Sequence, residues 1–156
     1  MSRAIRKRPK IGDVVEIPTP LGLAYAHFTH KHPTFGALLR VLPGVFPEQP
    51  KDTATLVRQT PQFLAFFPLG AACNRGIVRV VANEPIPVEA HAFPTFRSGI
   101  ANREGVVENW WLWDGEKEWK VGAMRPGMEH LPIRGVWNDT LLVERIVSGW
   151  CHADVA

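Results

Sequence analysis

The chain has 156 residues, of which 46% are hydrophobic and 21% are charged, and its formal net charge is +3. This composition fits one globular domain and excludes a disordered chain, a coiled coil and a collagen-like repeat. No apolar run approaches the ~20 residues of a membrane helix. Two cysteines, Cys73 and Cys151, are too few for a disulfide framework, so we expect a cytoplasmic protein with reduced thiols that does not associate with membranes.

The basic character of the chain is concentrated at its start. Residues 1–10 contain no acidic side chain and five basic ones, which are Arg3, Arg6, Lys7, Arg8 and Lys10. We expect residues 1–10 to form a flexible basic arm and residues 11–156 to form a single β-rich domain. Residues 84–156 carry seven basic and eleven acidic side chains, a net charge of −4.

The apolar segments are short and interrupted, which favours strands over helices. In chain order the expected strands are Asp13–Ile17, Leu23–His30, Gly36–Leu42, a weak Ala54–Arg58, Gln62–Phe67 and Gly76–Ala82. Pro18 should end the first strand, and Gly22 should turn it into a hairpin with the second. Residues 43–53, with three prolines, should form a loop. The continuously apolar fifth and sixth strands should be central and adjacent, with Tyr25 packed near them.

A hairpin is the clearest local prediction. Asp114-Gly115 separates the run Trp-Trp-Leu-Trp at residues 110–113 from an alternating run at residues 116–121. Asp and Gly tolerate the positive φ angles of hairpin turns, so the two runs should pair as antiparallel strands. Alternation in the second run predicts that Trp119 and Val121 face inward.

The sequence does not determine the register of this hairpin, and two registers are possible. A two-residue loop pairs Trp113 with Glu116 and places Trp111 and Trp113 on the face of Glu116 and Glu118. A bulged loop pairs Leu112 with Glu116 and places Trp110 and Leu112 on that face. Either register sets a bulky apolar pair beside two acids.

The C-terminal region contains one ambiguous element. Residues 140–147 are rich in β-branched side chains, but Asn138 is a candidate helix N-cap and Gly149 a candidate helix end. Helix and strand are equally favoured there. The whole pattern predicts a mainly β domain: a bent antiparallel sheet or small, partly open SH3-like barrel of seven or eight short strands, with one or two short helices at most.

Catalytic and metal-binding patterns are weak. His30 and His32 share one face of an extended strand while His27 points away, so this cluster offers two metal ligands and no recognisable third. Neither Cys73 nor Cys151 lies in a nucleophile signature, and no phosphate-binding or dinucleotide-binding motif is present. We therefore predict no metal, no cofactor and no enzymatic activity.

Five segments, taken in order, resemble the immunity protein 26 (Imm26) family of bacterial polymorphic toxin systems. They are KIGDVVEIPTPLGLAYAHF at residues 10–28, GIVRVVANEPIP at 76–87, FPTFR at 93–97, WWLWDG at 110–115 and GVWNDTLLVERI at 135–146. The resemblance implies a non-catalytic cytoplasmic protein that binds and neutralises a cognate toxin domain.

Tryptophans beside acids are typical of protein interfaces, so the 110–120 hairpin is our candidate partner-binding surface. One of Trp110, Trp111 and Trp113 would anchor the partner, and Glu116 and Glu118 would form a charged rim. Two alternatives remain open. One is a nucleic-acid-binding β-barrel that uses Arg3, Arg6, Lys7, Arg8 and Lys10, and the other is a small-ligand or enzymatic barrel.

Overall fold

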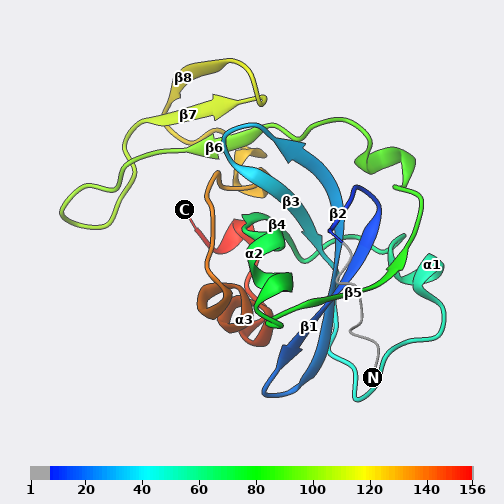
Figure 1. Ribbon diagram of the computed structural model, residues 1–156. Helices are drawn as coiled ribbons and strands as arrows, with labels where there is room; N and C mark the ends of the chain where they lie inside the picture. Colours follow the sequence, from blue (N-terminus) through cyan, green and yellow to red (C-terminus); the bar gives the residue numbers. More distant parts are fainter. Residues whose placement is uncertain (1–7, 156) are drawn as a thin grey trace.

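A computed structural model describes residues 8–155, so Arg3, Arg6 and Lys7 of the basic arm lie outside the described residues. Within that range, eight strands form two antiparallel sheets (Figure 1). The larger sheet contains β1 (Asp13–Thr19), β2 (Gly22–His32), β3 (Gly36–Val41), β4 (Phe63–Phe67) and β5 (Arg79–Asn83). The smaller contains β6 (Phe96–Ser98), β7 (Trp110–Trp113) and β8 (Glu118–Gly122). The predicted fold class, mainly β with a bent antiparallel sheet, is confirmed.

The larger sheet has the strand order β4-β3-β2-β1-β5. The prediction that the two continuously apolar strands are central and adjacent is therefore wrong, because β4 and β5 lie at opposite edges. β4 is nevertheless buried because residues 135–137 cover its outer edge: Phe66 donates to the carbonyl of Gly135 (3.3 Å), and Trp137 donates to the carbonyl of Phe66 (3.0 Å). A continuously apolar sequence therefore predicts neither a central position in the sheet nor full burial, because β4 is buried at one edge while β5 is only half-buried at the other.

The first hairpin forms as expected but extends further. Pro18 pairs with Leu23 and Thr19 with Gly22, so β1 continues two residues past its predicted end. Pro18 is exposed and keeps an extended backbone next to the turn, where proline is tolerated. Gly22 adopts a φ of 139°, and a Cβ there would lie 2.6 Å from the carbonyl oxygen of Phe46, so the turn requires glycine.

Residues 132–137 join the two sheets. The backbone amide of Arg97, in β6, donates to the carbonyl of Pro132 (2.8 Å), and the backbone amide of Arg134 donates to the carbonyl of Arg97 (2.9 Å). The same segment then pairs with β4 through Phe66, as described above. Because it binds β6 at one end and β4 at the other, this segment holds the small sheet against the large one.

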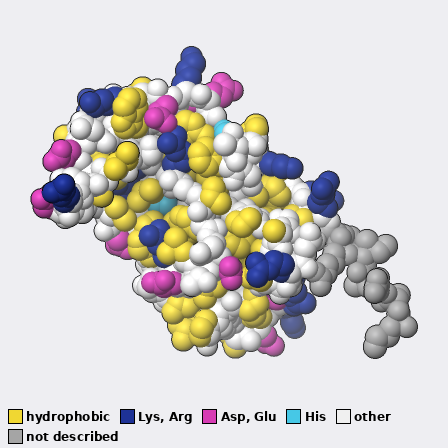
Figure 2. Space-filling model, turned by 60° about the vertical axis from the view of Figure 1, so that its left-hand side comes forward, with side chains coloured by type: hydrophobic (Ala, Val, Ile, Leu, Met, Phe, Trp, Pro, Cys, Tyr) yellow, Lys and Arg dark blue, Asp and Glu magenta, His cyan; other side chains and the backbone are white. Residues whose placement is uncertain are grey.

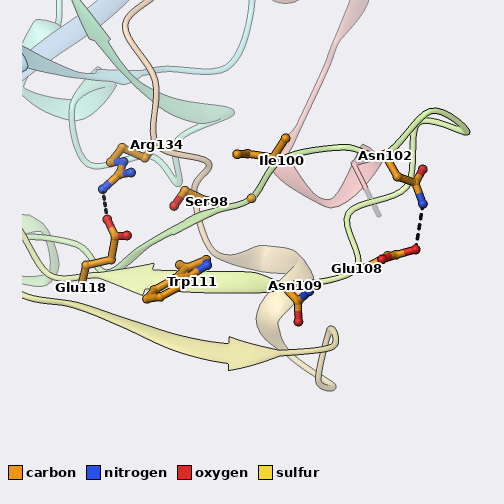
Figure 3. A pocket seen from close by; sticks show the side chains of 9 residues that line it. Ser98, Ile100, Asn102, Glu108, Asn109, Trp111, Glu118 and Arg134 are labelled. Carbon is orange, nitrogen blue, oxygen red and sulfur yellow. Dashed lines mark hydrogen bonds and ion pairs between the residues drawn. The ribbon is translucent and has the colours of Figure 1, made fainter.

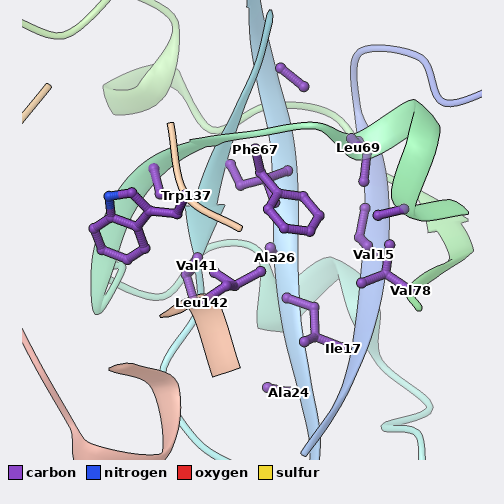
Figure 4. Packing of buried hydrophobic residues seen from close by; sticks show 14 of the residues in the cluster. Val15, Ile17, Ala24, Ala26, Val41, Phe67, Leu69, Val78, Trp137 and Leu142 are labelled. Carbon is purple, nitrogen blue, oxygen red and sulfur yellow. The ribbon is translucent and has the colours of Figure 1, made fainter. Parts of the chain in front are cut away.

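The main core lies between one face of the large sheet and the helices α2 (Leu69–Asn74) and α3 (Asp139–Ser148) (Figure 4). Val15, Ala26, Phe67 and Leu142 are among its fully or almost fully buried members. A second cluster, made of Leu38, Phe66, Phe96 and Trp113 with half-buried Phe35, Leu64 and Phe93, fills the space between the two sheets. These aromatic contacts fix the position of the β7–β8 hairpin.

The described residues form three α-helices, one more than the maximum of two that we expected. Residues 139–148 form α3: the Asn138 side chain accepts from the amide of Leu141 (2.8 Å), and Gly149 ends the helix with a φ of 70°. The weak strand expected at 54–58 is wrong, because Asp52 caps a single helical turn, α1 (Thr53–Leu56). The unexpected α2 follows β4 directly. Three short 3-10 helices, Val88–Ala90, Met128–His130 and His152–Asp154, complete the described elements.

Candidate functional site

The β7–β8 hairpin turns through four residues, so neither predicted register is correct. Asp114 Oδ1 accepts hydrogen bonds from the amides of Glu116 (2.9 Å) and Lys117 (2.8 Å). This side-chain turn closes the loop over residues 114–117 and pairs Trp113 with Glu118. Trp111 and Trp113 therefore share a face with Glu118, while Glu116 lies in the exposed turn.

Two of the three candidate anchor tryptophans are buried. Trp110 is 2% exposed, with the guanidinium of Arg97 4.6 Å from its ring centroid, and Trp113 is 6% exposed. The ring of Trp113 packs against His32, Phe35 and Phe93. Burial removes Trp110 and Trp113 from the accessible surface.

Two other tryptophans of the hairpin are accessible. Trp111 is 37% exposed, and Trp119, which was expected to face inward, is 41% exposed. Trp119 pairs with Leu112, so it lies on the opposite face of the small sheet from Trp111. The inward prediction for Trp119 is wrong because the face of the hairpin that packs on the large sheet is the one that carries Trp113, and Trp119 lies on the other face.

Trp111 lies in a groove between the small sheet and the 99–109 loop (Figure 3). The groove has a volume of about 470 Å³. We call it the Trp111 groove, and its lining residues are Ser98, Gly99, Ile100, Asn102, Glu108, Asn109, Trp111, Glu118 and Arg134. Ile100, which is 91% exposed, and Trp111 supply its main apolar surface.

Polar pairs stand at both ends of the groove, with Ser98, Ile100 and Trp111 between them (Figure 3). At one end Arg134 Nη1 donates to Glu118 Oε2 at 2.6 Å. At the other end Asn102 Nδ2 donates to Glu108 Oε1 at 3.1 Å. Among residues 8–155, the carboxylate of Glu108 has no ion-pair partner. The groove therefore carries one negative charge in excess.

Arg134 is a site residue that the sequence analysis missed. Its guanidinium lies 5.3 Å from the ring centroid of Trp113 and 5.6 Å from that of Phe35, and these contacts hold it toward Glu118. Arg134 reaches the groove because residues 132–137 pair with β6. That pairing joins segments more than 30 residues apart, and no local pattern signals it.

The 99–109 loop supplies the other wall. The side chain of Asn102 accepts from the amides of Glu104 (3.0 Å) and Val106 (2.9 Å), which folds the loop back on itself. The side of the molecule that lies on the left in Figure 1 presents hydrophobic side chains scattered among charged side chains of both signs (Figure 2). Such a mixture is ordinary for a protein surface, so the candidate site is the Trp111 groove and not this face as a whole.

The predicted histidine cluster is tied to the backbone. His27 is fully buried, with Nε2 3.0 Å from the carbonyls of Gly12 and Glu84, and burial lowers its pKa. His30 and His32 bind the carbonyls of His91 (2.9 Å) and Gly115 (2.8 Å). Within the described part of the chain, no group of three or more His, Cys, Asp or Glu side chains is placed to hold a metal ion.

The two cysteines and the basic arm lie away from the Trp111 groove. Cys73 is half-buried in α2, and burial raises the pKa of its thiol; Cys151 is also half-buried. Arg8 and Lys10, the described members of the arm, line a second groove beside β5.

No family model, curated protein or solved structure matches this chain. None of the helices within residues 8–155 is long and apolar enough to cross a membrane.

Proposed function

We propose that this chain is a cytoplasmic, non-catalytic binding protein that captures a protein partner in the Trp111 groove. The observation that carries the proposal is the exposure of Trp111 and Ile100 side by side in a groove bounded by polar pairs. The resemblance to immunity protein 26 supports a toxin domain as the partner.

The geometry of the groove fits a binding hot spot. Tryptophan is among the residues that contribute most to protein interfaces, and such anchors are surrounded by polar groups that exclude water. Glu108, Asn109 and the Arg134–Glu118 pair form such a surround for Trp111. Burial of Ile100 and Trp111 by a partner removes apolar surface from water, which favours binding by about 25 cal/mol per Å².

Charge favours a basic partner. The excess negative charge at Glu108 lies in a groove floored by Trp111, so an arginine or lysine of the partner can contact both the carboxylate and the ring face. The net charge of −4 on residues 84–156 adds long-range attraction for such a partner. A nuclease toxin, which must bind phosphate backbones, has this character.

The experiment compares Trp111→Ala with Trp119→Ala. The two side chains are similarly exposed, at 37% and 41%, and lie in one hairpin on opposite faces. Affinity for the toxin domain encoded beside this gene is measured by calorimetry, after circular dichroism has shown that both variants fold. Truncation of an anchor costs about 2 kcal/mol or more, so Trp111→Ala should weaken binding about 30-fold and Trp119→Ala less than twofold. Equal loss in both variants, or loss only in Trp119→Ala, would place the interface elsewhere.

A further inference from the structure

The two edges of the large sheet differ in how they are covered. The outer edge of β4 is occupied by Gly135, Trp137 and His152, which bind its backbone at Phe66 and Leu64. β5 pairs with β1 on one side only. Among residues 8–155, no backbone group outside the sheet bonds to the backbone of residues 80–82. An edge strand directs alternate N–H and C=O groups outward, so β5 presents free hydrogen-bonding groups.

A groove follows this open edge. Its volume is about 980 Å³, and its apolar lining includes Ile77, Val78, Val80, Val81 and Ala82. Residues 80–82 are half-buried, so they offer apolar surface beside the free backbone groups. Natural edge strands are usually blunted by central lysines or prolines or by a bulge. In β5 the central residues are Val-Val-Ala, and the blunting feature present is a register shift that leaves Val81 without a partner in β1.

The charges along the groove are mainly basic. Asp13 accepts from the amide of Lys10 (2.9 Å) and from Asn83 (3.0 Å), and Glu16 is bound by Arg79, so both carboxylates are already engaged. Arg8 and Lys10 line the same groove, and neither side chain forms an ion pair with another residue in the range 8–155. Hydrogen bonds from neutral donors do not cancel the charge of Asp13, so the cations Arg8, Lys10 and Arg79 exceed the carboxylates of Asp13 and Glu16 by one, and the lining carries a net positive charge.

A second copy of the chain fits this edge poorly. Lys10 lies near the Asn83 end of β5, because Asp13 binds both residues, whereas Arg79 stands at the other end. Antiparallel pairing of two β5 strands would bring Arg79 of one copy toward Lys10 of the other. Parallel pairing would set the two Arg79 side chains side by side. Like charges opposed in this way disfavour association.

We propose that β5 accepts an extended, carboxylate-bearing peptide segment of a partner protein as a sixth strand of the large sheet. The backbone of the segment would pair with the outward groups of β5, as in other cases of strand addition. Its apolar side chains would contact Val80 on one face of the sheet and Ala82 on the other, because the register shift at Val81 sets these two residues on opposite faces. Its carboxylates would meet Arg8 and Lys10. The site is separate from the Trp111 groove, because the two share no lining residue.

The probe is a display library of random linear dodecapeptides selected on the full chain. The selected peptides should contain apolar residues and be enriched in Asp and Glu. A synthetic copy of the best peptide should lose at least tenfold in affinity for Arg8→Glu/Lys10→Glu. The matched control Lys117→Glu/Lys120→Glu, on the small sheet, should bind it like the wild type. Trp111→Ala should also bind it like the wild type, which separates this proposal from the one above.

Two further measurements test the strand pairing itself. Hydrogen–deuterium exchange should show new protection of amides within residues 79–83 when the peptide binds. A version of the peptide with alternate backbone nitrogens methylated should not bind, since it lacks the N–H groups that a new strand supplies. The proposal is overturned if no peptide is enriched, if acidic residues are not enriched, if the basic-to-acidic variant binds equally, or if protection appears elsewhere. A dimer in sedimentation equilibrium that protects residues 79–83 would also overturn it, in favour of a second copy.

Discussion

The imidazole of His152 closes the edge of β4 at Leu64. Its Nε2 lies 3.1 Å from both the amide nitrogen and the carbonyl oxygen of Leu64, and its Nδ1 accepts from the amide of Ile133 at 3.1 Å. Because Ile133 donates to Nδ1, the neutral ring carries its proton on Nε2 and donates it to the Leu64 carbonyl. A side chain from the C-terminal segment thus takes the place of a neighbouring strand.

This arrangement predicts a loss of stability in mild acid. Burial, together with the nearby positive charges of Arg97 and Arg145, lowers the pKa of His152 from 6.5 to about 4. Between pH 6.5 and pH 4, His152 is protonated in the unfolded chain and neutral in the folded chain. The contribution of His152 to the unfolding free energy is therefore fully present above pH 6.5 and is lost as the pH falls toward 4. A difference of this size corresponds to about 3 kcal/mol.

Urea unfolding between pH 7 and pH 4.5 measures the effect. In His152→Gln the fall in unfolding free energy should be much shallower, although the variant is less stable at pH 7. The buried His27, whose pKa is also lowered, keeps part of the slope in both proteins. An unchanged slope in His152→Gln would show that folding does not lower the pKa of His152.

A hydrogen bond from Tyr25 stabilises the buried carboxylate of Glu16. Tyr25 Oη donates to Glu16 Oε1 at 2.8 Å, Arg79 binds the other oxygen, and the Glu16 side chain is 4% exposed. A hydrogen bond to a charged group contributes about 2 kcal/mol, so Tyr25→Phe should lower the unfolding free energy by that amount at pH 7. In a Glu16→Gln background the same change should cost about 1 kcal/mol, because the acceptor is neutral. Equal costs in the two backgrounds would mean that the charge plays no part.

The two edges of the large sheet should respond differently to truncation. Phe66 of β4 is fully buried, so Phe66→Ala should cost about 3–5 kcal/mol in chemical denaturation. Val80 of β5 is half-buried, so Val80→Ala should cost about 1 kcal/mol. Comparable costs at the two positions would contradict the difference between a covered edge and an open one.

Glu116, in the exposed turn of the hairpin, allows a test of whether negative charge on this surface speeds association with the toxin domain. Glu116 forms no ion pair with another residue of the described chain, so Glu116→Lys changes charge without disturbing a contact. Rim charges act mainly on association, so this variant should slow the association rate with the toxin domain severalfold at low salt and leave dissociation unchanged. The effect should disappear at high salt. Faster association in the variant would indicate an acidic partner.

Features formed by residues close together in the sequence are predictable from it, whereas features formed by distant segments are not. The β1–β2 hairpin and the caps of α3 are local, and Gly22, Asn138 and Gly149 mark them directly. The site depends on contacts between distant segments. Residues 132–137 pair with both β4 and β6, and this pairing carries Arg134 to Glu118.

The same long-range packing decides which tryptophans are exposed. Trp113 is buried because Phe35 and Phe93 converge on it from other segments, whereas Trp111, two residues away on the same face, lies beyond them. The alternating pattern of the hairpin identifies the two faces but not what covers each of them. The Asp-Gly pair predicts that the chain turns there but does not predict the four-residue loop, whose length is set by two hydrogen bonds to the Asp114 side chain.

The most direct test of the Trp111 groove is the ¹H–¹⁵N NMR spectrum of the indole Nε1–H groups, recorded as the unlabelled toxin domain is added. The signal of Trp111 should shift or broaden at stoichiometric toxin, while the signal of Trp119, equally accessible on the opposite face, should stay in place. A shift of Trp119 with no change at Trp111, or no change at either, would contradict the assignment of the groove as the partner-binding site.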